Sequence, residues 1–190
     1  MSEFRIFATL ALLIMLWLLR DRAAWRALAR GLSGRAGRLP LFRRLLQITL
    51  LAALVLLLSG LARPMTGGTM SGYWLIAHLL AAPVFAVVFL KMVFFTAAQH
   101  QTAEDETALV RAVVLQNRRD LRVLFTPALR LRLLYWLAVS LATLAMATAG
   151  LRLFAFGDTA TQVWLAGWHR YAAVLFFLAA AGYLRRAVKE

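Results

Sequence analysis

The sequence predicts an all-α integral membrane protein, a helical bundle of four core transmembrane helices plus an N-terminal transmembrane anchor. Of its 190 residues, 63% are hydrophobic, whereas a soluble domain is typically about 45–50% apolar. The hydrophobic residues are gathered in long runs, and a helix needs about 20 such residues to cross a bilayer. The charged residues fall between these runs, which is typical of a multi-pass protein.

Five apolar runs are candidate spanning helices, at residues 4–19, 45–62, 73–95, 133–154 and 163–184. The first run is short, so it is either a full span or a tilted, partly inserted helix. We interpret it as an uncleaved anchor and not a signal peptide, because no small-x-small cleavage site precedes Arg20. The chain therefore divides into residues 1–44, an anchor helix with an Arg-rich segment, and residues 45–190, a four-helix membrane bundle.

The distribution of basic residues predicts the orientation of the chain. The net charge is +14, with eight arginines in residues 20–44, seven basic residues in 91–132 and three more at the C-terminus. With five spans these clusters share one side, which the positive-inside rule makes cytoplasmic. We expect an outside N-terminus and a cytoplasmic C-terminus in a bacterial inner membrane. The charge then faces anionic membrane lipid, and no nucleic-acid partner is expected.

Two histidines lie inside the apolar runs. His78 and His169 each lie about six residues from the same predicted end of their helices. An ionisable ring in hydrocarbon is costly and usually functional, and two at one depth suggest a shared metal ligand. Neutral imidazoles can fill both axial positions of a haem iron. The sequence thus predicts one haem b with metal ligands His78 and His169; the alternative is that each ring only hydrogen-bonds to a neighbouring helix.

Residues near the same helix ends are candidates for contacts to the cofactor. Gly60 and Gly150 have no Cβ and would let helix backbones pass close to a porphyrin edge, although glycine also serves ordinary helix packing. Haem propionates are anionic, and Arg63, Arg152 and Arg170 are nearby cations. For Arg170 the alternative is snorkelling to the interface.

Other residues limit the chemistry. The chain has no Cys, which excludes iron–sulfur clusters and covalent c-type haem. The four later runs hold no Asp or Glu, so a proton- or cation-coupled transporter lacks its usual carboxylate. No hydrolase motif is present. We expect His100 to be a solvated histidine, with a quinone-binding or proton-exchanging role as the alternative, and Met92 and Met146 to be packing residues.

Three segments carry a resemblance to a known family. They are Gly72-Tyr-Trp-Leu-Ile-Ala-His78-Leu-Leu-Ala-Ala-Pro83-Val-Phe85, the pair Tyr135-Trp136, and Gly167-Trp-His169-Arg170-Tyr-Ala-Ala-Val-Leu. They resemble the four-helix cytochrome b subunits, such as cytochrome b561-like proteins and the cytochrome b subunits of formate dehydrogenase and nickel–iron hydrogenase. The resemblance covers roughly residues 45–186. It implies a haem b held by His78 and His169 and electron transfer between the quinone pool and a partner subunit.

The chain departs from the dihaem members of that family, because it lacks a second histidine pair. A single haem near the outer face favours exchange with an extracytoplasmic cytochrome c or iron–sulfur protein, with quinone as a further candidate partner. We expect an electron-transfer subunit of an oxidoreductase complex, with catalysis carried out elsewhere. The alternative is a haem-free structural or anchor subunit of a larger complex.

Overall fold

The structure is a computed structural model, and it describes residues 2–19, 40–66, 71–101, 127–155 and 157–187. Over these residues the fold is all-α, as the sequence predicts. Its elements are α1 (Ser2–Leu19), α3 (Pro40–Thr66), α4 (Gly72–Ala97), the short 3-10 helix η2 (Ala98–His100), α6 (Pro127–Leu153) and α7 (Thr159–Ala187). Helices α3, α4, α6 and α7 contain stretches long and apolar enough to cross a bilayer, so the chain is a multi-pass membrane protein.

The helices extend beyond the apolar runs that predict them. α6 begins at Pro127 and α3 at Pro40, several residues before the runs at 133 and 45. Hydropathy marks only the part of a helix that lies in hydrocarbon, whereas backbone hydrogen bonds continue through the flanking arginines. Proline suits the first helical position because its missing N–H would have no partner there.

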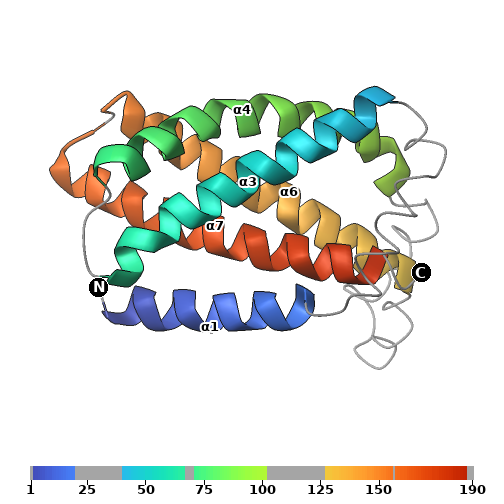
Figure 1. The fold of residues 1–190 in the computed structure, drawn as a ribbon, viewed down its shortest axis with the longest axis horizontal. Helices are drawn as coiled ribbons and strands as arrows, with labels where there is room; N and C mark the ends of the chain where they lie inside the picture. Colours follow the sequence, from blue (N-terminus) through green and yellow to red (C-terminus); the bar gives the residue numbers. More distant parts are fainter. Residues whose placement is uncertain (1, 20–39, 67–70, 102–126, 156, 188–190) are drawn as a thin grey trace, which may run out of the picture.

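The bundle consists of two antiparallel hairpins with α1 beside them (Figure 1). α3 packs closely on α4, and α6 packs closely on α7, while the two hairpins approach each other less closely. We call the end where α3 leads to α4 and α6 leads to α7 the turn end, and the other the C-terminal end. Helices α1, α4 and α7 all run from the turn end to the C-terminal end. Side chains from both hairpins fill the space between the hairpins.

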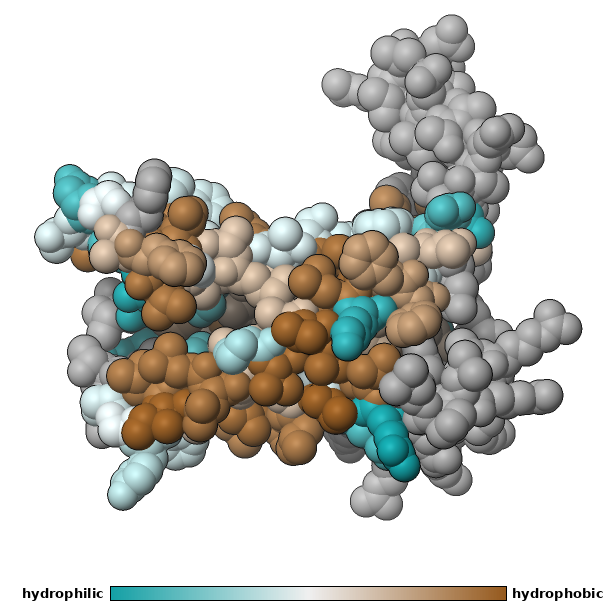
Figure 2. Space-filling view, turned by 90° about the horizontal axis from the view of Figure 1, so that it is seen from above, coloured by the Kyte–Doolittle hydropathy of each residue, from teal (hydrophilic) through white to brown (hydrophobic). Residues whose placement is uncertain are grey.

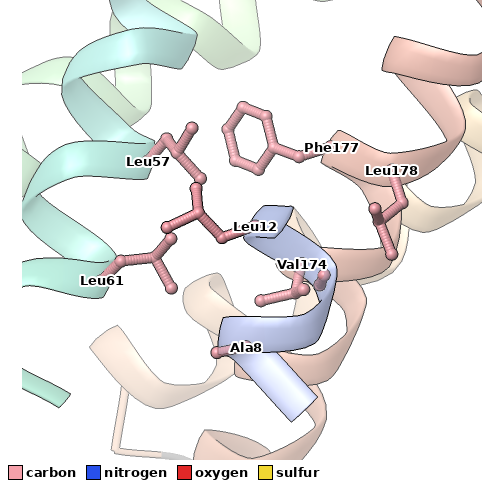
Figure 3. A pocket seen from close by; sticks show the side chains of 8 residues that line it. Ala8, Leu12, Leu57, Leu61, Val174, Phe177 and Leu178 are labelled. Carbon is pink, nitrogen blue, oxygen red and sulfur yellow. The ribbon is translucent and has the colours of Figure 1, made fainter. Parts of the chain in front are cut away.

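α1 lies along α7 and also touches α3 (Figure 1). Its buried face is formed by Phe4, Ala8 and Ala11, which pack on Val174 of α7. A small pocket at this junction is lined only by apolar side chains (Figure 3). The 18 residues of α1 correspond to about 27 Å of helix, close to the roughly 30 Å of a hydrocarbon core. Its role as a spanning anchor stays a prediction.

A tight turn joins α6 to α7. Gly157 has φ 86°, and a Cβ there would lie 2.7 Å from Thr161 Cγ2, so the turn requires glycine on grounds of both backbone conformation and space. The next residue, Asp158, accepts a hydrogen bond from the Thr161 backbone N–H at 2.8 Å and caps α7. Hydrogen bonds from the Thr161 side chain and from its backbone N–H hold the pKa of the Asp158 carboxyl below its usual value.

The middle of the bundle is an aromatic layer between the hairpins. Phe85 of α4 and Phe176 of α7 are buried, and their ring centroids are 5.7 Å apart. The ring centroid of Phe89 is 5.8 Å from that of Phe176. Buried alanines of α3, α6 and α7 face these rings, and their small side chains leave the space that the rings fill. On the outside, hydrophobic side chains cover much of the helices (Figure 2), as a lipid-facing surface requires.

The aromatic layer makes a testable prediction at Ala142, whose side chain is 1% exposed within this core. Ala142→Leu inserts a larger side chain into filled space and should destabilise the protein by about 1–3 kcal/mol. Thermal unfolding of the detergent-solubilised protein measures the loss. The neighbouring Thr143 is exposed, so Thr143→Leu is the control and should leave the midpoint unchanged. Equal midpoints for both variants would contradict the assigned core.

Candidate functional site

The structure brings the two predicted histidines together between the hairpins. The ring centroids of His78 on α4 and His169 on α7 lie 6.2 Å apart, and the ring planes are inclined by 82°. Both residues are half-buried. The site lies toward the turn end of the bundle. The face seen in Figure 2 is hollowed at that same end, with hydrophilic side chains inside the hollow.

The two helices place their histidines by a common register. Phe85 is seven positions after His78 on α4, and Phe176 is seven positions after His169 on α7. Seven residues make about two helical turns, so each histidine lies on the same helix face as the phenylalanine two turns after it. Because Phe85 contacts Phe176 and the helices run in the same direction, His78 meets His169. The histidines are not equally far from their helix starts, since α7 begins at Thr159, earlier than the sequence predicts.

Each histidine is held by the other helix of its own hairpin. Nδ1 of His169 donates to the Ala145 carbonyl on α6 at 2.9 Å. Nδ1 of His78 lies 2.9 Å from Ser59 Oγ on α3. The single hydroxyl proton of Ser59 is donated to the Val55 carbonyl at 2.6 Å, so Ser59 accepts the Nδ1–H of His78.

These bonds define the tautomer of both rings. With Nδ1 protonated, each neutral imidazole presents the lone pair of Nε2. Within the described part of the chain, no hydrogen-bond donor to either Nε2 is found. A histidine that binds a metal commonly donates its other ring N–H to a carbonyl or similar acceptor, and both rings have that arrangement.

The separation of the rings fits a metal held between them. A metal–nitrogen bond is about 2 Å long, and the centroid of an imidazole ring is roughly 1 Å from its nitrogen. Two rings bound to opposite sides of one metal therefore have centroids about 6 Å apart. Among the described residues, no cluster of three or more His, Asp or Glu side chains could hold a metal ion. Two imidazoles could hold an iron whose remaining ligands come from a porphyrin.

The predicted glycines occupy different surroundings. Gly60, next to Ser59, lies against the His78 ring, and an added Cβ would be 3.5 Å from Cε1 of that ring. Gly150, near the end of α6, has no atom within 4 Å of where its Cβ would be. Gly60 therefore lies at the site itself, and Gly150 leaves space near the turn end.

Two of the three predicted arginines are described with their side chains. Arg152 and Arg170 are exposed, and both charges act electrostatically on His169. The Arg170 guanidinium lies 5.9 Å from the centre of the Phe4 ring, within reach of a cation–π contact. The side chain of Arg63, at the end of α3, lies outside the described part of the structure.

A second polar cluster lies at the C-terminal end, where the expectation of a solvated His100 is wrong. His100 is 7% exposed. Its Nδ1 donates to the Thr96 carbonyl at 2.9 Å, and Tyr183 donates its hydroxyl to Nε2 at 2.8 Å. The Tyr135 ring stacks on His100 with centroids 4.0 Å apart, and Trp136 Nε1 donates to the His100 carbonyl at 2.9 Å. The cluster joins α4 and η2 to α6 and α7.

The sequence reasoning missed these partners for identifiable reasons. Ser59, 1% exposed, is a hydroxyl in an apolar run, and its place beside Gly60 was the available signal. The Ala145 carbonyl is backbone and leaves no mark in a sequence. For His100, an apolar helix ending in a histidine gave no sign that Tyr135 and Tyr183 would reach it. The expectation that Met146 is a packing residue is confirmed, because it packs on the central core.

Comparisons of the chain with protein-family models, with curated proteins and with solved structures find no match. The resemblance to cytochrome b subunits therefore stays a prediction, and the geometry of the two polar clusters carries the functional argument.

The C-terminal-end cluster predicts a stability effect of Tyr183→Phe. Removing the hydroxyl leaves Nε2 of the buried His100 without its donor, which should cost about 1–3 kcal/mol and lower the thermal midpoint. Tyr73 is 90% exposed, so Tyr73→Phe serves as the matched control and should have no effect. A Tyr183→Phe protein as stable as the parent would contradict a structural role for this hydrogen bond.

Proposed function

We propose that this chain is a membrane cytochrome b subunit that binds one haem b between His78 and His169. The observation that carries the proposal is the pair of rings 6.2 Å apart, each with its Nδ1 bonded within its own hairpin and its Nε2 lone pair free to bind iron. When bound, the haem supplies reversible one-electron transfer at iron. The chain's residues hold the haem, exclude water from it and set its potential.

The haem-free structural alternative accounts for less of this geometry. In that case the histidines serve only as hydrogen-bond partners between helices. The bonds to Ser59 and Ala145 are of that kind, but they use one nitrogen of each ring. The other nitrogen would remain an unpaired acceptor in a low-dielectric bundle, which is costly. A metal at both Nε2 atoms removes that cost.

Charge at the turn end supports the same proposal. Arg152 and Arg170 lie near His169, where they would neutralise haem propionates. We assign the turn end to the outer face of a bacterial inner membrane, because the Arg-rich segments flank the helices at the other end.

This position of the haem suggests how electrons enter and leave. A single cofactor toward the outer face, followed by a dry layer of phenylalanine, exchanges electrons most directly with an extracytoplasmic cytochrome c or iron–sulfur subunit. Quinone from the bilayer is a second candidate partner. We assign substrate chemistry to another subunit of the complex.

Ligand variants test the proposal directly. The purified parent protein should show the alpha band of a low-spin haem b in its reduced-minus-oxidised spectrum. His78→Leu and His169→Leu should each lose at least about nine-tenths of the haem, because one imidazole cannot hold the iron in low-spin form. His100→Phe is the control and should retain the band even if it lowers thermal stability. Parent-like spectra in either ligand variant would refute the assignment.

Arg170→Leu tests the electrostatic part of the proposal. Removing a positive charge near the iron favours the ferric state, so the midpoint potential should fall by on the order of tens of millivolts. A redox titration of the purified protein measures the shift. Arg44→Leu removes an exposed charge in α3 at the C-terminal end and should leave the potential unchanged. An equal potential in the Arg170 variant and the parent would rule out a charge contact with the haem.

A further inference from the structure

Each histidine of the pair has a hydrogen bond that restrains the rotation of its ring. The imidazole of a haem ligand can turn about its bond to the iron, and its orientation is set by what its other nitrogen contacts. For His78 that contact is Ser59 Oγ, and for His169 it is the Ala145 carbonyl. The two acceptors lie on different hairpins, so each hairpin sets the plane of its own ring.

Ser59 is well suited to this role because its position is itself restrained. Its side chain is 1% exposed. Its hydroxyl donates to the Val55 carbonyl at 2.6 Å and lies 3.3 Å from the Leu56 carbonyl. A hydroxyl held by these carbonyls keeps its lone pairs directed toward His78. The Ala145 carbonyl is likewise fixed by α6. It lies 3.0 Å from Thr148 Oγ1, whose hydroxyl also donates to the Leu144 carbonyl at 2.8 Å.

We infer that Ser59 is a positioning residue for the His78 ligand, and that with Ala145 it holds the two axial imidazole planes nearly perpendicular. The inclination of 82° between the rings is the geometric basis. This inference rests on the proposed function. It goes further, because haem binding alone does not decide whether the planes are parallel or perpendicular.

The relative orientation of the planes has a direct spectroscopic signature. In a ferric low-spin haem, parallel imidazole planes split the iron d orbitals strongly and give a rhombic EPR spectrum. Nearly perpendicular planes leave two of these orbitals almost equal in energy and give a spectrum with one very large g value. The accepted hydrogen bond also makes His78 a stronger donor to iron, so loss of the acceptor should raise the midpoint potential.

The experiment compares the parent protein, Ser59→Ala and Ser59→Thr, all loaded with haem, by low-temperature EPR and redox titration. The parent should show the large-g spectrum. Ser59→Ala should retain haem but shift toward a rhombic or heterogeneous spectrum with a higher potential, and Ser59→Thr, which keeps a hydroxyl, should restore the parent spectrum. Thr49→Ala is the matched control, because Thr49 makes the same type of bond in α3, to the Leu45 carbonyl at 2.8 Å, away from the histidines.

The outcomes separate this inference from the proposed function. A haem-containing parent with a rhombic spectrum, or a Ser59→Ala protein with the parent's spectrum and potential, overturns the role of Ser59 and leaves the haem assignment standing. A parent without haem overturns both. If Ser59→Ala fails to fold or loses haem, the parent spectrum decides the angle, and nitrogen NMR of the haem-free parent decides the positioning. A proton on Nδ1 of His78 supports the inference, and a proton on Nε2 overturns it.

Discussion

The arrangement of the site depends on one constraint, that an imidazole inside an apolar bundle needs an acceptor for the N–H of its ring. In this bundle both histidines do so at Nδ1 and with the adjacent helix of their own hairpin, through Ser59 for His78 and Ala145 for His169. Each hairpin therefore carries a complete half of the site. Neither bond crosses between the hairpins, so the Nε2 atom of each ring is left for the proposed iron.

Three layers of side chains lie along the bundle. The histidine pair lies toward the turn end, the phenylalanine layer around Phe85 and Phe176 fills the middle, and the His100 cluster joins the hairpins at the C-terminal end. In the first layer, the Nε2 atoms of both histidines have no hydrogen-bond partner among the described residues. The middle layer is apolar, and in the third both ring nitrogens of His100 are occupied. In the proposed function, cofactor binding belongs to one end of the bundle and attachment of the two hairpins to the other.

Sequence patterns predicted the fold class and identified the two histidines that lie together, because hydropathy and rare ionisable residues can both be read from the sequence alone. They placed helix ends too far inward, since charged flanking residues such as Arg130 remain helical outside the hydrocarbon. They also missed Ser59, Ala145 and the burial of His100. These depend on which faces of separate helices meet, and a backbone carbonyl or a single hydroxyl leaves little trace in a sequence. The seven-residue spacing from each histidine to a phenylalanine was present but becomes informative only once α4 and α7 are known to run in the same direction.

The most direct measurement of the central claim is an experimental density map of the purified, membrane-extracted protein at the level of His78 and His169. We expect planar porphyrin density between the two rings, with iron bonded to both Nε2 atoms and each Nδ1 still bonded within its hairpin. Rings separated by lipid or by protein side chains alone, with no planar density between them, would contradict it.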